Sequence, residues 1–155
     1  MTEADILLKG SDDTLLVVEV KERQVSAAEI PEQIEWWRQR LPKAQRTIFA
    51  LVDLSMITFY ELPADMTDTQ PKLLFSASML ETLSVYDPDL LNKLTAEPRG
   101  FMFGYYLEGL VKAWLADVLH GWRGDVAPHR ADFLHANLIT AFQHSYPERR
   151  AALPA

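Results

Sequence analysis

Cysteine is absent from this chain of 155 residues. Its absence excludes disulfide bonds, thiolate zinc sites and a cysteine nucleophile, and it fits the reducing cytoplasm, where we expect this protein. Long apolar runs are absent as well, since none approaches the roughly 20 residues that a helix needs to span a bilayer. The acidic residues 1–5 do not resemble a secretory signal. We therefore expect no membrane partner.

Signatures of several enzyme classes are also missing. The sequence contains no Gly-x-Ser-x-Gly elbow of a serine hydrolase and no glycine-rich phosphate loop. The histidines form no i, i+4 ligand pair with a third partner nearby, so we interpret all of them as structural or surface residues: His120, His129, His135 and His144. Positive charge is in deficit, because 15 Lys and Arg face 22 Asp and Glu, a net charge of −7. Any contact with nucleic acid must therefore use a local basic patch or a bridging metal ion.

The sequence does contain enough apolar residues, 48% of the chain, for one domain with a packed core. We expect an α/β (α+β) domain over residues 1–155, with a small mixed sheet of about four strands and flanking helices. Residues 1–62 are expected to form the sheet core with one helix, and residues 72–146 to be mostly helical. Strands are predicted over 5–9, 14–21, 47–52 and 56–61, with a brief edge strand at 73–75. Helices are predicted over 26–41 (or from Pro31), 78–85, 88–94, 101–119 and 130–144, with a connection at 63–71 and a loose tail at 147–155.

The candidates for chemistry are Asp5, Glu19 and Lys21, which lie on the first two predicted strands. Alternation with period two places Glu19 and Lys21 on the same face of the sheet. A turn in which Gly10 faces Thr14 places Asp5 opposite Glu19 on that face. A slip of one residue would turn Glu19 to the other face, so the predicted site requires the first register.

Two carboxylates on adjacent strands are hard oxygen ligands that suit Mg²⁺ or Mn²⁺, and the carbonyl of Val20 could serve as a further ligand. The ammonium of Lys21 can stabilise developing negative charge or orient an attacking water. The competing interpretation is a strand that ends in solvent, because short acid–lysine pairs at strand ends are common. Spacing alone leaves both interpretations open.

This pattern resembles the PD-(D/E)xK nuclease superfamily, which has the restriction-endonuclease-like fold. The first half-motif is Ala4-Asp5, without the usual proline, and the second is Glu19-Val20-Lys21, which is complete. Residues 33–37, Gln-Ile-Glu-Trp-Trp, are similar to the Gln-x-x-x-Tyr element of the RecB-type branch, with tryptophan replacing tyrosine. Residues 107–117 are similar to the C-terminal helix of small stand-alone bacterial members, many of which are uncharacterised.

The resemblance implies a metal-dependent hydrolysis of a phosphodiester by an activated water. It implies that Asp5 and Glu19 are ligands of Mg²⁺ or Mn²⁺ and that Lys21 is the catalytic lysine. As nucleic-acid partner we expect DNA in preference to RNA, although the sequence does not decide between them. The resemblance gives Gln33 a role in orienting the site or the nucleic acid. The superfamily core usually begins with a helix, often carrying a further acid, and a strand ahead of the Asp-bearing strand. This sequence begins almost at Asp5, so we expect a homodimer or a partner chain that supplies these elements.

A local basic cluster follows the second half-motif. It contains Arg38, Arg40, Lys43 and Arg46, with Trp36 and Trp37 nearby. Such a cluster could follow a phosphate backbone with an aromatic ring for stacking, or it could be a solvated helix end. The candidates for orienting the site or the nucleic acid are Gln33, Trp37, Arg38 and Arg40. A function of another class also stays open, namely a non-catalytic binding or assembly module with the same fold, whose helical half makes the interface.

Overall fold

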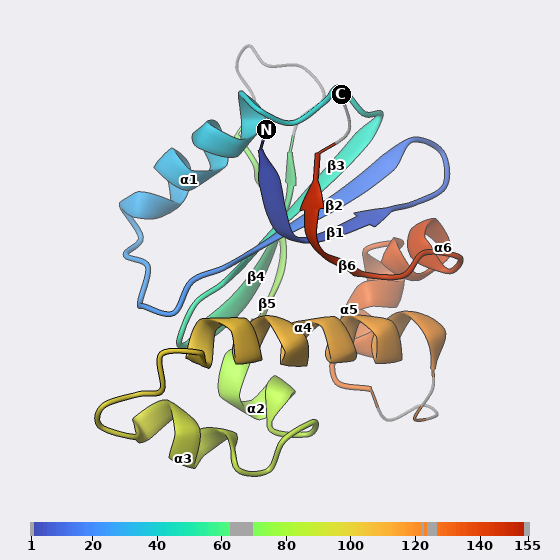
Figure 1. Ribbon diagram of the computed structural model, residues 1–155. Helices are drawn as coiled ribbons and strands as arrows, with labels where there is room; N and C mark the ends of the chain where they lie inside the picture. Colours follow the sequence, from blue (N-terminus) through green and yellow to red (C-terminus); the bar gives the residue numbers. More distant parts are fainter. Residues whose placement is uncertain (1, 63–69, 122, 124–126, 154–155) are drawn as a thin grey trace.

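A six-stranded mixed sheet runs through the computed structural model, which describes residues 2–62, 70–121, 123 and 127–153 (Figure 1). Its strands are β1 (Glu3–Lys9), β2 (Thr14–Val20), β3 (Arg46–Val52), β4 (Met56–Leu62), β5 (Lys72–Ser78) and β6 (Glu148–Ala152). The order across the sheet is β5-β4-β3-β2-β1-β6. Only the β2–β3 pair is parallel among these five pairings. The mixed α/β class is therefore confirmed.

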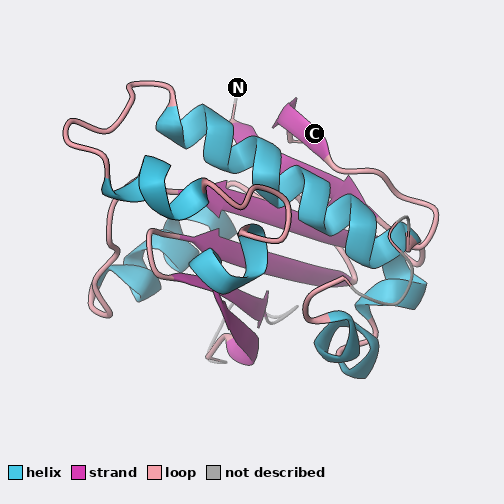
Figure 2. Ribbon diagram, turned by 90° about the horizontal axis from the view of Figure 1, so that it is seen from below, coloured by secondary structure: helices cyan, strands magenta, loops and turns pink. Residues whose placement is uncertain are grey.

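Six helices occur in the described part of the chain. They are α1 (Glu29–Arg38), α2 (Met79–Leu83), α3 (Leu90–Thr95), α4 (Phe103–His120), α5 (Arg130–His135) and α6 (Leu138–Phe142). The helix α1 makes the crossover that a parallel β2–β3 pair requires, and it covers one face of the sheet (Figure 1). The long helix α4 runs across the opposite face, together with α2, α5 and α6 (Figure 2). None of these helices has both the length and the apolarity required to cross a membrane.

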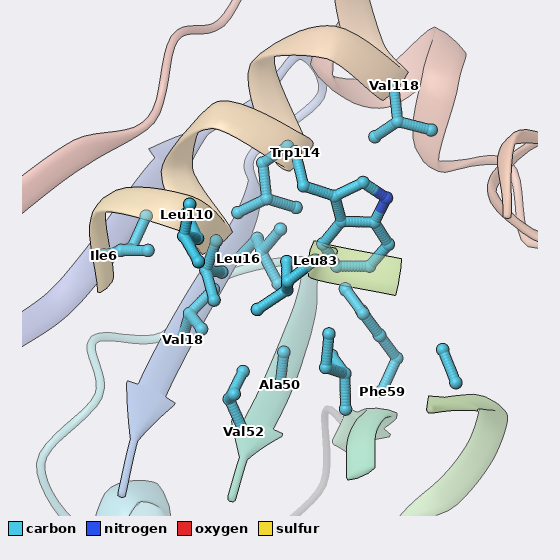
Figure 3. Packing of buried hydrophobic residues seen from close by; sticks show 14 of the residues in the cluster. Ile6, Leu16, Val18, Ala50, Val52, Phe59, Leu83, Leu110, Trp114 and Val118 are labelled. Atoms are coloured by element: carbon cyan, nitrogen blue, oxygen red, sulfur yellow. The ribbon is translucent and has the colours of Figure 1, made fainter. Parts of the chain in front are cut away.

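The face under α4 holds the larger core. Trp114 of α4 is fully buried against Phe59 of β4, with ring centroids 6.0 Å apart, and against Phe133 of α5 at 5.5 Å. Alternate residues of the central strands point into the same space, as Figure 3 shows for Leu16 and Val18. The intervening residues of these strands form a smaller cluster under α1. Burial on both faces explains the continuous apolar run of β2.

Local signals in the sequence set several element ends. Ser78 caps α2 through its hydroxyl, which accepts the N–H of Glu81 at 3.1 Å. Gly121 ends α4 in the left-handed conformation with φ 67°. Before α1, the N–H of Ser26 donates to the Glu29 carboxylate at 2.9 Å, which is one half of a capping box. The helix itself begins three residues after Ser26 and contains Pro31 in its first turn.

The strand count and two predicted segments differ from expectation. The sheet has six strands in the described residues rather than about four, because the edge strand β5 is longer than predicted and the segment expected to be a loose tail forms β6. The helix predicted over 130–144 is divided into α5 and α6 by Asn137, which has φ 60°. Most of the connection predicted at 63–71 lies outside the described residues.

Candidate functional site

The turn between β1 and β2 has the register that the site requires. The N–H of Gly10 donates to the carbonyl of Thr14 at 2.8 Å. The ladder pairs Leu8 with Leu16 and Ile6 with Val18. Continuing it by one residue would place Asp5 opposite Glu19, which is the register that the predicted site requires.

The regular ladder between these strands ends one residue before the site. Beyond Ile6 and Val18, the side chain of Asp5 replaces the backbone as partner: its Oδ2 accepts the N–H of Val20 at 2.7 Å. A residue's N–H and C=O point to the same side of a strand, so the Val20 carbonyl also points toward β1. Asp5 and the Val20 carbonyl therefore lie on the same side of β2.

Glu19 and Lys21 form an ion pair at the end of β2. The Lys21 Nζ lies 3.0 Å from Glu19 Oε1, and the two side chains are 27% and 15% exposed, Lys21 first. The backbone of Lys21 is also held, because its N–H donates to the Val52 carbonyl of β3 at 2.8 Å. The structure thus brings together the three residues that the sequence singled out.

Burial and like charge act together on Glu19. Desolvation is the largest cause that raises the pKa of this carboxyl from 4.5 to about 7, and the negative charge of Asp5 raises it further, against the opposing effect of Lys21. A hydrogen bond with the Asp5 side chain also raises it. Two carboxyls that hinder each other's ionisation must lie close together. A cation between them would remove this penalty.

Asp53, the acid that follows β3, uses its carboxylate oxygens for backbone hydrogen bonds rather than as a third partner of Asp5 and Glu19. Asp53 Oδ1 accepts the N–H groups of Ser55 and Met56, both at 2.8 Å, and its Oδ2 accepts the N–H of Val25 at 3.2 Å. Both oxygens therefore stabilise turns. No group of three or more His, Cys, Asp or Glu side chains suited to a metal ion occurs among the described residues. A divalent ion at Asp5 and Glu19 would have two carboxylates, could add the Val20 carbonyl, and would keep several waters, as Mg²⁺ commonly does.

The strand β6 pairs antiparallel with β1, on the side of β1 away from β2. The helix α4 contacts β1, β2 and β6, and it carries a buried acid, Glu108, which is 3% exposed. The strand beside β1 and the acid-bearing helix that contacts it both come from later in the chain than β2. The predicted homodimer or partner chain stays a prediction.

Glu108 is held by two arginines that the sequence did not single out. The Arg150 guanidinium binds it in a bidentate manner, at 2.9 Å from Nε and 2.6 Å from Nη2, and Arg149 lies 3.7 Å away. Burial raises the pKa of Glu108, Arg150 opposes this, and the charge of Asp5 adds to the rise. This acid is therefore close enough to the candidate site to affect its electrostatics.

Consecutive residues of a regular strand point to opposite faces, yet Arg149 and Arg150 both reach α4. The reason is the backbone of Arg150, whose φ is 54°. A residue other than glycine rarely adopts this conformation. The only hint in the sequence was Glu108 itself, which with Asp117 is one of two acids on the apolar helix α4. The segment Arg-Arg-Ala-Ala of β6 shows no strand-like alternation, so nothing predicted its partner.

The residues proposed to orient the site or the nucleic acid lie on or after α1. Gln33 is half-buried, and Trp37 is 2% exposed, packing on Phe49 with ring centroids 6.3 Å apart. Arg38 lies 3.6 Å from Glu35. Arg40 lies over the exposed Trp36 ring at 3.8 Å. In this structure Trp37 is therefore a core residue, and Trp36 with Arg40 forms the exposed aromatic and cationic pair.

Comparisons of the chain with protein-family models, with curated proteins and with solved structures found no match.

Proposed function

We propose that this protein is a metal-dependent nuclease of the PD-(D/E)xK type, which hydrolyses phosphodiester bonds of DNA at Asp5, Glu19 and Lys21. The observation that carries the proposal is the meeting of these three residues at the end of β2, where burial and the Asp5 charge raise the pKa of Glu19 to about 7. A carboxyl whose pKa is shifted by burial together with a specific neighbouring charge is a candidate for a functional site.

Each residue has a distinct role in the proposed reaction. Bound Mg²⁺ or Mn²⁺ would supply Lewis-acid activation of a water and of the scissile phosphate. Asp5 and Glu19 would hold that ion, and the hydrogen bond from Val20 N–H fixes the Asp5 carboxylate. Lys21 contributes a positive charge from a backbone that is anchored to β3. Its ammonium stabilises negative charge on the phosphate as the bond to the leaving oxygen breaks.

The surrounding architecture supports the same proposal. The resemblance implies a helix with an acid and a strand ahead of the Asp-bearing strand. In this chain β6 pairs with β1, and α4, which carries the buried Glu108, contacts β1 and β2, which supports the proposal. The parallel β2–β3 pair connected through α1 also agrees with it. In the sheet, β6 thus lies beside β1 and β3 lies beside β2, so both strands of the candidate site have neighbours.

Cleavage assays test the proposal directly. Single- and double-stranded DNA would be incubated with the protein and Mn²⁺, and Lys21→Ala should reduce the cleavage rate by about 10²-fold or more, as removal of a charge-stabilising group does. Lys112→Ala is the matched control, because this lysine is exposed on α4 and its loss should leave the rate unchanged. Equal residual cleavage by Lys21→Ala and the wild type would refute the catalytic assignment.

A specific observation favours a second candidate, the non-catalytic binding or assembly module. One oxygen of Asp5 is already used by the Val20 N–H, and the described residues hold no third acidic ligand. Isothermal titration calorimetry with Mn²⁺ distinguishes the two functions. Binding that Asp5→Asn abolishes in a folded protein supports the nuclease, whereas no heat of binding in the wild type supports the module.

A further inference from the structure

The segment that leads into α4 exposes a large aromatic ring. Phe101 is 93% exposed, and Met102 beside it is 51% exposed. Burying a phenylalanine ring is favourable by about 1.5–3 kcal/mol, so a ring left in water at a loop is available for a partner. The neighbouring Gly100 is surrounded by open space, since a Cβ added there would meet no atom within 4 Å.

This segment is attached to the end of β2 by Glu22, the residue that follows Lys21. The Glu22 Oε2 accepts the N–H of Gly104, at the start of α4, at 2.9 Å. The same carboxylate, Arg99, Gly100, Phe101 and Phe103 line one surface pocket. The exposed ring therefore lines a pocket whose wall includes the residue next to the proposed catalytic lysine.

The pocket also contains a cation, the guanidinium of Arg99. Arg99 forms no salt bridge within the described part of the chain, and its guanidinium lies 5.6 Å from the centre of the Phe103 ring. An arginine and an exposed ring two residues apart suit a phosphate and the base attached to it. Glu22, the other charged residue that lines the pocket, is negative and would repel a phosphate. Arg99 is therefore the residue of this pocket that suits contact with a phosphate.

We propose that Phe101 and Arg99 bind an unpaired nucleotide, so that the substrate is single-stranded nucleic acid or the unpaired end of a duplex. The proposal rests on the proposed nuclease function and specifies its substrate class. The net charge of −7 disfavours binding by phosphate contacts alone. Stacking of a base on an aromatic ring does not depend on a positive protein, and it requires a base that is not paired.

Fluorescence anisotropy without metal tests the binding step. A labelled single-stranded oligonucleotide should bind more tightly than the same sequence as a blunt duplex, and Phe101→Ala should weaken single-strand binding by about tenfold, the loss expected for one base–aromatic stack. Phe101→Trp should retain binding. Leu134→Ala is the matched control, because this side chain is 53% exposed on α5, and it should have no effect.

Separate readouts distinguish failure of this inference from failure of the proposed function. Equal affinity of wild type and Phe101→Ala overturns the inference, as does absence of single-strand binding. A change of oligomeric state in Phe101→Ala with unchanged nucleic-acid affinity also overturns it, because the ring then serves a protein interface. Binding that depends on Phe101, together with no Lys21-dependent cleavage in Mn²⁺, supports the binding site and refutes the nuclease.

Discussion

The carboxylate of Asp5, on β1, accepts the backbone N–H of Val20, on β2, at 2.7 Å. This bond replaces a ladder hydrogen bond at the point where the two strands cease to pair regularly. Because Val20 directly follows Glu19, this bond holds the Asp5 carboxylate near Glu19. Burial and the charge of Asp5 together raise the pKa of Glu19. The local arrangement therefore has consequences for stability as well as for metal binding.

The first prediction concerns pH. The Glu19 carboxyl has a pKa of about 7 in the folded protein and 4.5 as its ordinary value, so folding takes up a proton between these values. Stability of the wild type should then fall as pH rises through this window, by about 1–3 kcal/mol relative to Glu19→Gln. Urea denaturation of both proteins at about pH 5 and about pH 8 measures the difference.

A control with the opposite sign is available on α1. The pKa of Glu29 is lowered, first by the hydrogen bond from the Ser26 N–H and then by Arg23. Its contribution to stability is present above its ordinary pKa and is lost as pH falls, so Glu29→Gln should matter least at low pH. Parallel stability profiles for wild type and Glu19→Gln would contradict the raised pKa of Glu19.

The second prediction concerns the buried acid of α4. Arg150→Ala leaves Glu108, which is 3% exposed, without its bidentate partner, and should lower the free energy of unfolding by about 1–3 kcal/mol, since the arginine is itself partly in solvent. Adding Glu108→Gln should recover part of this loss, because no charge is then left buried. Urea denaturation measures both variants.

The exposed pair of Arg23 and Glu29 gives a control for this measurement. Their side chains are 52% and 37% exposed, so Arg23→Ala should change stability by no more than about 0.5 kcal/mol. A loss for Arg150→Ala as small as that for Arg23→Ala would show that the pair at Glu108 contributes nothing beyond a surface ion pair.

The third prediction separates two adjacent tryptophans. Trp37 is 2% exposed and Trp36 is 44% exposed. Trp37→Ala should cost about 3–5 kcal/mol by opening a cavity under α1, whereas Trp36→Ala should cost less than about 1 kcal/mol. Thermal and urea denaturation test the difference. Comparable losses for the two variants would contradict the assignment of Trp37 to the core.

The fourth prediction concerns a close backbone contact behind the β1–β2 turn. A Cβ added at Gly10 would lie 2.5 Å from the Ala141 carbonyl oxygen and 2.8 Å from the Phe142 ring. Gly10→Ala should therefore destabilise the protein by about 1–3 kcal/mol, as overpacking does. Gly100→Ala is the matched control, since nothing lies within 4 Å of that position. A neutral Gly10→Ala variant would mean that α6 can move away from the turn.

Much of the first half of the fold was predictable because its signals are local. Turn residues and alternation predicted the hairpin of β1 and β2, whereas the structure selected one of the two registers that the sequence left open. Ser78 and Gly121 marked helix ends through capping chemistry that depends only on near neighbours. The second half was less predictable, because Asn137 divides a continuous helical pattern by adopting positive φ.

The sequence by itself determined the mixed α/β class and the strands of the first hairpin, because period-two alternation and turn chemistry are properties of a few consecutive residues. Only the tertiary structure decided that β6 pairs with β1, that Glu108 and Arg150 join beside the site, and that the pKa of Glu19 is about 7. Strand partners, burial and charge proximity depend on residues more than a hundred positions apart in some cases, and no local pattern encodes them.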